Sequence, residues 1–561
     1  MKIPKIFIII PALIFSIIIS EPAFPGDRVL IVADTNRDGK VSFDDDVEGR
    51  NQWSEPRGAI FMFNNDSDQN TGHPDHSDKV INGTEDLKDL AVLLIKQTPN
   101  LEKNSKLYIT ISTPARPYVQ LFYKSGNDYL FIRENEKQEL PVQLLQNRDL
   151  ELRIEANSYP CPGWNGEVIV TARLKTGGEV SADSVRLRVA PFVMLSALQK
   201  ALRLYVREFP GKNEAFIKGL TDTTKLLGVE LRIIPAGTYD AWNIWLQDVM
   251  EVGYSQTPVQ CNHVVLKANR GKSLDDMPQQ KILGPDHGWF KIGEFIPGTG
   301  KGRGGDSWLD WYGNLEATPP LPGKPFGRIF YGYNRTTGKS LNPQIVKTLE
   351  AQGVQAPLIK IHTGWLLIKH VDEIFNFIPA GEGEAKGFKV LVPDVRVTYR
   401  LLEQWNREGK GALPLLEKIR KNETISTILN NRELKDYNLG LQEKEIEESI
   451  GMMKQATGIT ETQVIRIPAL FEKAGGFAGA LIPNMVNSVY TNGSQLMSDP
   501  RGPVEQGKDL LQEYVKGLLK KEKLEVYFLD DLPYHMWGGN VHCATNVTRE
   551  TYSTPWWQMD K

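Results

Sequence analysis

Cysteine is scarce in this sequence: 561 residues contain only Cys161, Cys261 and Cys543. An odd number excludes complete pairing within one chain, so at least one thiol is free or pairs between chains. Cys161 lies in a turn between two prolines, and Cys261 follows an apolar strand, where it can simply be buried. Cys543, in NVHCATN, stands beside a histidine among small polar residues, which makes it the candidate for a free, reactive thiol.

Net charge is also low. The chain has 66 basic and 69 acidic residues, which gives a formal charge of −3. This balance lacks the basic footprint of a nucleic-acid-binding protein, so we expect no nucleic-acid partner. The rest of the composition, 40% hydrophobic and 24% charged, is that of an ordinary globular protein, and the length predicts more than one domain.

The N-terminal apolar run, Ile6 to Ile19, is too short to span a bilayer comfortably. Two lysines precede it and small or turn-forming residues follow it, as in an export signal. We expect residues 1–27 to be a signal peptide, or else an uncleaved N-terminal anchor, and the mature chain to be secreted or periplasmic. If the segment is not an export signal, the chain is cytoplasmic. Beyond such an anchor we expect no membrane contact.

Residues 28–193 have the pattern of a β-sandwich. Short runs of alternating apolar and polar residues are separated by Gly, Pro, Asn and Asp. The predicted strands are KLYITIST, YVQLFYK, LELRIEA, GEVIVTARL and DSVRLRVAP. Helical periodicity is nearly confined to TEDLKDLAVLLIK.

Residues 194–561 have a different pattern, which begins near VAPFVM and alternates helices with strands. VELRIIPA is a predicted strand. The predicted helices are LSALQKALRLYVREF, NEAFIKGLTDTTKLLG, LNPQIVKTLEAQG, YRLLEQWNREG, LKDYNLGLQEKEIEESIGMMKQATG and KDLLQEYVKGLLKKE. The chain is therefore expected to be an α+β multidomain protein with an α/β or α+β unit of catalytic size at its C-terminal end.

Acidic residues gather at two places in the first domain. DTNRDGKVSFDDD has the spacing of an EF-hand-like calcium loop from Asp34 to Asp45, but the flanking helices are missing, and a turn of solvated carboxylates explains it equally well. The second cluster gathers carboxylate and amide oxygens so densely that they repel one another unless a hard cation neutralises them. It predicts calcium, and its members are Asn64, Asp66, Asp68, Asp75, Asp78, Asp86 and Asp89.

Two polar groups interrupt apolar stretches of the second domain. In NIWLQDVMEVGY, a strand would place Gln247 and Glu251 on one face and Asp248 on the other. In HVDEIFNFIPA, a strand would place His370 and Asp372 on one face, either as a structural pair or as a general acid/base beside a carboxylate. PGTGKGRGGDSW, residues 297–308, lacks the spacing of a phosphate-binding P-loop and is expected to be a flexible loop.

One cysteine, one histidine and two aspartates can together form a site for a guanidinium group. Two carboxylates can hold this planar cation through bidentate hydrogen bonds. A thiolate can attack its central carbon, and a histidine can protonate the departing nitrogen. Spacing alone does not establish that these residues meet.

The order of the motifs resembles the protein-arginine deiminases, a calcium-dependent family. The motifs of the second domain are WLQDVMEVGY, NRGK, ILGPDHGW, YGNLEATPP, HVDEIFNFIPA, PNMVN and VHCATNV, and those of the first are GAIFMFNNDSD, EDLKDLAVL and DSVRLRVAP. The resemblance implies an immunoglobulin-like middle domain over residues 28–193. It also implies a pentein, a five-fold pseudo-symmetric α/β propeller, over residues 194–561. The implied activity is hydrolysis of protein-bound arginine to citrulline with release of ammonia.

The resemblance also implies roles for single residues. Cys543 would be the nucleophile and His370 the general acid/base, while Asp248 and Asp372 would bind the guanidinium nitrogens. Arg270 would hold the substrate's backbone carbonyls. Trp245 would form an aromatic wall of the substrate tunnel. The resemblance also implies two calcium-binding regions, one at the active site and one in the middle domain. The active-site ligands are Gln247, Glu251, Glu316 and the carbonyls of Tyr312 and Leu315, and the middle-domain ligands are Asn64, Asp66, Asp68, Asp75, Asp86, Asp89, Glu155 and Asp286.

The sequence departs from the family at several positions. Val249, Val265 and Leu266 stand where a second calcium near the active site has acidic and hydroxyl ligands, so we expect that ion to be absent. We expect the extra N-terminal domain of animal members to be absent here, with the export-like segment in its place. Trp537 and Gly538 replace more polar residues near the nucleophile, which points to a different side-chain preference around the target arginine.

Two other functions stay open at this point. Related penteins act as deiminases or amidinotransferases on a free small guanidine, whereas a backbone-reading Arg270 favours arginine-containing proteins or peptides as substrates. The carboxylate-rich sandwich would also suit a secreted calcium-binding adhesion module with a degenerate catalytic domain. The resemblance leaves a homodimer open as the oligomeric state.

Overall fold

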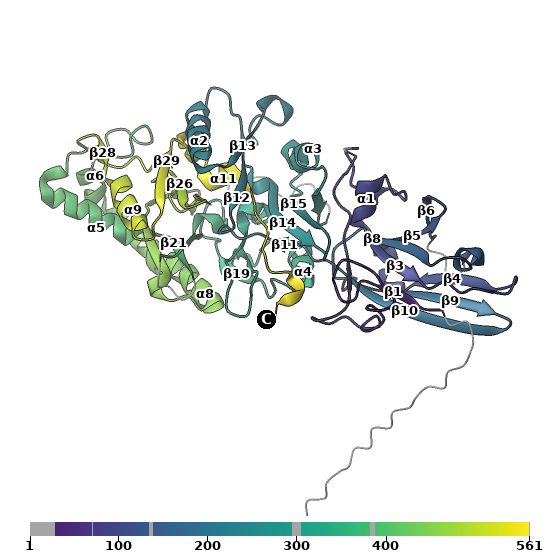
Figure 1. Cartoon of the computed structure of the whole chain (residues 1–561). Helices are drawn as coiled ribbons and strands as arrows, with labels where there is room; N and C mark the ends of the chain where they lie inside the picture. The colour runs from purple at the N-terminus through teal and green to yellow at the C-terminus, as the bar shows by residue number, and fades with distance from the viewer. Residues whose placement is uncertain (1–28, 70, 134–137, 294–304, 382–386, 560–561) are drawn as a thin grey trace, which may run out of the picture.

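The computed structural model of the chain describes residues 29–69, 71–133, 138–293, 305–381 and 387–559 (Figure 1). The predicted export segment, residues 1–27, lies outside these ranges, as does most of the loop predicted over residues 297–308. Within the described ranges, no helix has the length and apolar character needed to cross a membrane.

The N-terminal domain is a sandwich of two five-stranded sheets (Figure 1). One sheet has the order β1 (Ile31–Ala33), β3 (Ala91–Ile95), β8 (Leu150–Ala156), β5 (Val119–Ser125) and β6 (Asp128–Phe131). The other has the order β2 (Ala59–Phe61), β10 (Glu179–Val189), β9 (Glu167–Thr176), β4 (Lys106–Ile111) and β7 (Glu139–Leu140). The β-sandwich predicted from alternating residues is confirmed.

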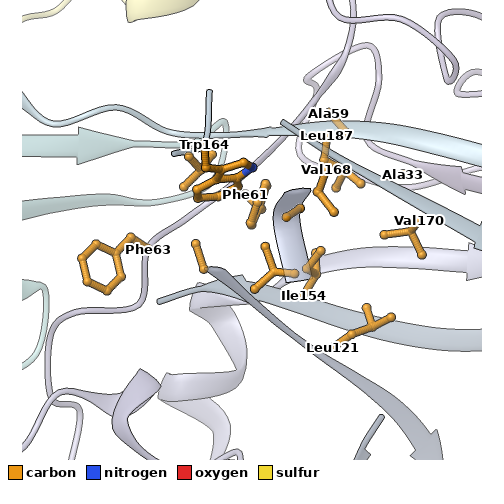
Figure 2. Packing of buried hydrophobic residues seen from close by; sticks show 14 of the residues in the cluster. Ala33, Ala59, Phe61, Phe63, Leu121, Ile154, Trp164, Val168, Val170 and Leu187 are labelled. Carbon is orange, nitrogen blue, oxygen red and sulfur yellow. The ribbon is translucent and has the colours of Figure 1, made fainter. Parts of the chain in front are cut away.

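The sandwich core follows from this alternation, because successive side chains of a strand point to opposite faces. Leu121 and Ile154 from one sheet and Val168 and Leu187 from the other are fully buried and face one another (Figure 2). TEDLKDLAVLLIK, predicted as helical, divides into α1 (Thr84–Asp89) and strand β3. The helical prediction was wrong for the second half, because AVLLI pairs with strands on both sides.

The C-terminal region repeats one three-stranded sheet five times within the described residues. In each repeat the first strand is antiparallel to the second, and the second is parallel to the third. The repeats are β14 (Met250–Gln256), β15 (Cys261–Lys267), β16 (His287–Lys291); β17 (Leu315–Ala317), β18 (Ile329–Tyr333), β19 (Ile359–His362); β20 (Asn376–Pro379), β21 (Phe388–Asp394), β22 (Val464–Pro468); β25 (Val489–Thr491), β26 (Ser494–Ser498), β29 (Glu525–Leu529); and β30 (Thr545–Arg549), β12 (Ala201–Arg207), β13 (Glu230–Ile234). Five such repeats agree with the pentein architecture.

Each parallel pair needs a crossover connection, and a helix provides it. The crossover helices are α3 (Met277–Lys281), α4 (Pro343–Ala351), α5 (Val395–Trp405) with α6 (Ile425–Asn430), α7 (Arg432–Leu441) and α8 (Glu447–Thr457), then α9 (Leu510–Lys520) and α2 (Glu214–Leu227). Strand β11 (Val193–Met194) extends the first sheet, and β23 (Phe471–Ala474) with β24 (Phe477–Ala480) and β27 (Val504–Glu505) with β28 (Lys508–Asp509) form hairpins. The fifth repeat joins the two ends of the region, because β30 pairs with β12.

One further local prediction was wrong. LSALQKALRLYVREF, predicted as a helix, contains strand β12, because pairing with β13 and β30 outweighs the helical preference of Leu, Ala and Arg. Cys261, for which the sequence left burial open, is exposed at the start of β15.

The two domains share one apolar cluster. Phe290 and Leu315 from the five-repeat region belong to the same cluster as Phe61 and Leu187 from the sandwich. At another contact the guanidinium of Arg188 lies 4.7 Å from the Trp53 ring centroid and 5.5 Å from that of Trp556, near the C-terminal end of the chain. The sandwich is therefore packed directly against the five-repeat region.

Candidate functional site

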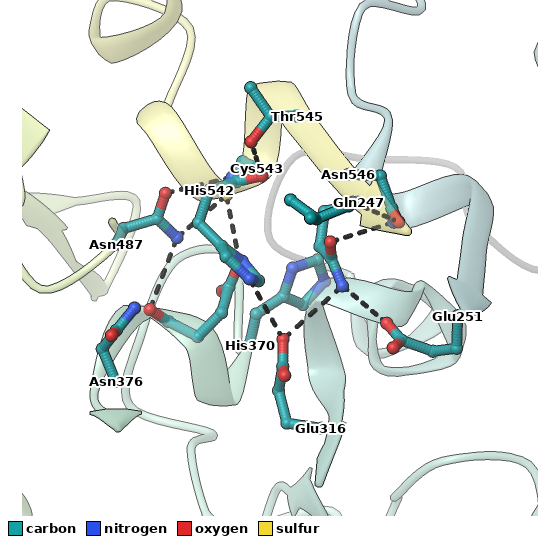
Figure 3. Close-up of polar contacts among 12 residues, drawn as sticks. Gln247, Glu251, Glu316, His370, Asn376, Asn487, His542, Cys543, Thr545 and Asn546 are labelled. Carbon is teal, nitrogen blue, oxygen red and sulfur yellow. Dashed lines mark hydrogen bonds and ion pairs between the residues drawn. The ribbon is translucent and has the colours of Figure 1, made fainter. Parts of the chain in front are cut away.

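Polar residues meet where the first strands of the five repeats begin. Short helices stand directly before three of these strands: Gln247–Val249 before β14, Tyr312–Asn314 before β17, and α11 (Val541–Ala544) before β30. A fourth, Val371–Glu373, precedes β20 by two residues, and Asn487 lies two residues before β25. Figure 3 shows side chains from all five segments or their strands pointing toward one another.

Cys543 is buried among hydrogen-bonding groups. Its Sγ lies 3.1 Å from Asn487 Nδ2 and 3.4 Å from Asp372 Oδ2, and its backbone N–H donates to Asn487 Oδ1 at 3.1 Å. Burial, together with the negative charges of Asp372 and Asp248, holds the pKa of the thiol well above its usual value. In the absence of a cation between the carboxylates, Cys543 is therefore a thiol.

Asp248 connects a histidine and an arginine. Its Oδ1 lies 3.6 Å from His370 Nδ1, and its Oδ2 lies 3.6 Å from the Arg270 guanidinium. His370 Nε2 lies 2.9 Å from the Trp308 carbonyl oxygen, which can only accept, so Nε2 carries the proton and Nδ1 is the atom that gains or loses one. Nδ1 is buried and has no hydrogen-bond partner, so it is available to a reacting group.

The backbone at position 313 lies so close to the His370 ring that only glycine fits there. A Cβ at this position would collide with the His370 ring and lie 3.2 Å from Asp248 Oδ1.

Arg270 is also buried and is held by two side chains. Asp275 accepts from its Nε at 2.7 Å, and Asn243 accepts from its terminal nitrogen at 3.2 Å. The site therefore has a rigid arginine on the Asp248 side.

Trp245 lies beside the nucleophile. Its indole is half-buried, and the ring of Tyr534 meets it edge-on with centroids 5.7 Å apart. A Cβ at Gly539 would collide with the Trp245 indole and would lie 3.1 Å from the Cβ of Cys543. Trp245 and Gly539 thus form a narrow wall next to the thiol.

A second group of predicted residues surrounds a cavity of about 40 Å³, lined by Gln247, Glu251 and Glu316 among others. Gln247 Nε2 donates to Glu251 Oε1 at 2.5 Å and to Glu316 Oε1 at 3.5 Å, while its oxygen accepts from Asn546. Burial and the neighbouring Glu316 raise the pKa of Glu251, and burial raises that of Glu316 to about 7. Two buried carboxylates that resist joint ionisation fit a cation site. Leu315 directly precedes Glu316 along the chain, and Tyr312 lies four residues before it.

His542 connects this cavity to the nucleophile. Its Nδ1 lies 2.9 Å from Asp372 Oδ2, and its Nε2 lies 3.4 Å from Glu316 Oε1. Burial opposes its charge, but Glu316 and Asp372 raise the pKa of His542 above the ordinary value. The His542 imidazole thus lies between a substrate-side carboxylate and a cavity carboxylate.

The acidic cluster of the sandwich also has the donor set of a calcium site. Ligand oxygens of Asp66, Asp68 and Asp89 lie within 4.8 Å of one another. Asn64 Oδ1, Asp66 Oδ1, Asp68 Oδ2 and both Asp89 oxygens are buried without a hydrogen-bond partner. Burial, then repulsion from neighbouring carboxylates, raises the pKa of Asp66 to about 8 and that of Asp89 to about 10.

The remaining predicted ligands of the sandwich surround this group. Asp86 and Glu155 both accept from the Asn64 amide, at 2.8 and 2.9 Å, and Asp75 accepts from the backbone N–H of Asp68. Asp286, from the five-repeat region, donates its backbone N–H to Asp66 Oδ2 at 2.9 Å. Hard oxygen donors, several of them unpartnered, fit a calcium ion.

The expected strand at each polar group was wrong. Gln247–Val249 and Val371–Glu373 are single 3₁₀ turns, so Gln247 and Glu251 do not lie on one face of a strand, and neither do His370 and Asp372. The turn lets the Gln247 amide contact Glu251 four residues on, and it directs Asp248 toward His370. Over three residues, a repeat of two cannot be told from a repeat of three.

Sequence reasoning assigned no role to His542, Asn487 or Asn546. All three lie within the motifs VHCATNV and PNMVN, so a signal was present. An amide or imidazole has many structural uses, and only the contacts with Cys543, Asp372 and Gln247 reveal the role of these three.

Comparison with known proteins is consistent with this geometry. The family model described as protein-arginine deiminase (PAD) matches residues 179–558, and the model of the PAD middle domain matches residues 28–175. The chain is 31% identical to protein-arginine deiminase type-4 of Homo sapiens, covering 95% of this chain and 83% of that one. It is 31% identical to type-3 of Homo sapiens, covering 90% and 78%. A solved agmatine deiminase of C. jejuni aligns with 64% of this chain and 96% of its own at 10% identity and a TM-score of 0.37. The chain belongs to the protein-arginine deiminase family.

Proposed function

We propose that this chain hydrolyses protein-bound arginine to citrulline and releases ammonia. The observation that carries the proposal is the buried thiol of Cys543, 3.4 Å from Asp372, in the same site as the Asp248–His370 pair. A guanidinium between the two aspartates would neutralise the charges that now disfavour the thiolate. The substrate's own charge would thereby activate the nucleophile.

The chemistry follows from the positions of these groups. When the guanidinium binds, the Cys543 thiol gives up its proton, which His370 Nδ1 takes, and the thiolate attacks the guanidinium carbon while Asp248 and Asp372 hold the nitrogens. His370 gives a proton from Nδ1 to the leaving nitrogen, ammonia departs, and an S-alkylthiouronium remains on the cysteine. His370 then accepts a proton from water as the water attacks this carbon, and collapse of the adduct returns the thiol and citrulline.

Calcium is part of the proposal. Gln247, Glu251 and Glu316, with the carbonyls of Tyr312 and Leu315, would hold one ion, and its charge would let the buried carboxylates be ionised together. Gln247 would have to turn its amide, because its nitrogen now faces both glutamates. The acidic cluster of the sandwich would hold further calcium.

We also propose that residues 1–27 direct export of the chain. That the protein forms a homodimer stays a prediction.

A peptide substrate is favoured over a free guanidine by Arg270, which lies next to Asp248 and is held by Asn243 and Asp275. We expect a blocked arginine peptide to give citrulline in the presence of calcium, and free arginine to be turned over at least about 100-fold less efficiently, because it offers no flanking amide carbonyls. Chelation with EGTA should stop the reaction. Comparable kcat/KM for free arginine would identify a small-guanidine deiminase, and no ammonia from either substrate would favour the adhesion module.

The acidic cluster of the sandwich predicts an unusual stability profile. The pKa values of Asp66 and Asp89 in the folded protein, about 8 and about 10, exceed those of ordinary carboxyls, so the folded state binds more protons between about pH 4 and 10. The metal-free protein should therefore lose stability as pH rises through this range. Replacing Asp89 by Asn should raise the Tm of the metal-free protein at pH 8 by several degrees and reduce the gain in Tm on adding calcium.

The control for this prediction is Asp128→Asn, which removes an exposed carboxylate of β6 and should leave both Tm values unchanged. A metal-free Tm that falls in Asp89→Asn, with an undiminished response to calcium, would show that Asp89 is not part of a cation site. Differential scanning calorimetry with EGTA or calcium measures both values.

A further inference from the structure

Two tryptophans form an exposed stack on the surface of the five-repeat region. Trp242 is 63% exposed and Trp537 is 42% exposed, yet their rings lie 4.8 Å apart between centroids and 15° from parallel. Phe209 meets both rings edge-on, at 5.7 Å from Trp537 and 6.1 Å from Trp242, and Met536 beside them is 53% exposed. Water-exposed aromatic and apolar side chains gathered in this way are typical of binding surfaces.

The stack adjoins the catalytic site along both of its chain segments. Trp537 precedes Gly538 and Gly539, and Gly539 lies against the Trp245 indole and the Cβ of Cys543. Trp242 precedes Asn243, whose side-chain oxygen accepts from Arg270. Along the chain, the stack is therefore adjacent to the wall formed by Trp245 and Gly539 on one side and to the segment that holds the proposed backbone-reading Arg270 on the other.

Both segments are fixed before any ligand arrives. Arg207 is fully buried and donates to four carbonyl oxygens of the segment that carries Trp242, those of Ala236, Tyr239, Asp240 and Asn243. In the other segment, the backbone N–H groups of Trp537 and Gly539 both donate to the Tyr534 carbonyl, at 2.9 and 3.1 Å. A preorganised surface loses little conformational entropy on binding, so its apolar area can contribute to affinity.

We propose that the Trp242–Trp537 stack is a subsite for a large apolar or aromatic side chain next to the target arginine of a peptide substrate. The proposal rests on the proposed function and adds a substrate class to it. When the arginine side chain of a peptide enters beside Trp245, the residues next to that arginine lie near Gly539. Trp537 is only two residues before Gly539 in the chain, so a side chain next to the arginine can extend to the stack. The two indoles, with Phe209 and Met536, offer such a residue a rigid apolar contact.

The test compares three blocked tripeptides, each with a central arginine: one with glycine on both sides, one with phenylalanine before the arginine and one with phenylalanine after it. In the calcium-loaded wild-type enzyme, we expect one of the phenylalanine peptides to exceed the glycine peptide in kcat/KM by about tenfold, mainly through a lower KM. In Trp537→Ser and in Trp242→Ser, this ratio should fall to about one to two. Leu226→Ser, which removes an exposed leucine of α2, is the matched control and should keep the wild-type ratio.

The outcomes separate the two proposals. If the wild-type enzyme forms no citrulline from any of the three peptides, the proposed function is wrong. If it converts the glycine peptide and prefers neither phenylalanine peptide, the subsite is wrong while the function stands. A fourth tripeptide, with lysine beside the arginine, tests the competing mode of binding. If its kcat/KM exceeds that of both phenylalanine peptides, the proposal is overturned, because the indoles then bind a cation through their faces. Binding to the Cys543→Ser enzyme, followed by tryptophan fluorescence, gives the same comparison without turnover.

Discussion

Cys543→Ser should reduce citrulline formation from a blocked arginine peptide by at least about four powers of ten, to the limit of detection. Removal of the attacking atom of a covalent mechanism costs this much in other enzymes, because the remaining groups can bind and polarise the substrate but cannot form the intermediate. A hydroxyl is a weak nucleophile at its free pKa. In this site, moreover, Asn487 Nδ2 lies 3.1 Å from the sulfur, where its N–H can stabilise a thiolate once a guanidinium is bound between the two aspartates.

The measurement is ammonia and citrulline release under calcium, with mass spectrometry of the enzyme after acid quench. The wild-type enzyme should carry a substrate adduct on the peptide that contains Cys543, and the variant should carry none. Cys261→Ser is the matched control, because Cys261 is exposed at the start of β15, with Thr551 as its neighbour, and should keep full activity. A Cys543→Ser enzyme with wild-type turnover and an unchanged Tm would disprove covalent catalysis at this residue.

The sequence predicted the sandwich, five of the six long helical segments of the second domain and the identity of the polar residues, because each of these has a local pattern. Strand β12 could not be predicted, because most residues from Ala201 to Arg207 favour a helix. The segment becomes a strand by pairing with Glu230–Ile234 and with Thr545–Arg549. The partner β30 lies more than 300 residues away along the chain. No local pattern contains that information.

The geometry of the site could not be predicted from the sequence for a related reason. The polar segments at Gln247 and Asp372 belong to single 3₁₀ turns, too short for any period to be recognised. The role of His542 depends on Asp372 and Glu316, which come from different repeats, so it exists only once the repeats have assembled. The motif order brought these residues to attention through a family resemblance, and the contacts then showed which atoms face one another.

Asp372→Asn should change activity and thiol reactivity in opposite directions. The carboxylate of Asp372 is buried, lies 3.4 Å from the Cys543 sulfur and is one of the two groups proposed to hold the guanidinium. Removing one partner of a buried ion pair costs about 3–5 kcal/mol, or roughly two to four powers of ten in kcat/KM. The same carboxylate is also, after burial itself, the first cause of the high pKa of the thiol.

The variant should therefore react faster with iodoacetamide in the absence of substrate, by at least about tenfold near pH 8, since one pKa unit changes the thiolate fraction tenfold. A structural defect would predict a different result, because a distorted site would lower activity without a specific gain at one cysteine. Asp222→Asn, on the exposed surface of α2, serves as the control and should change neither rate. Slower alkylation of Cys543 in Asp372→Asn would mean that this carboxylate assists the thiolate instead of opposing it, and the proposal that the substrate's cation activates the nucleophile would then fail.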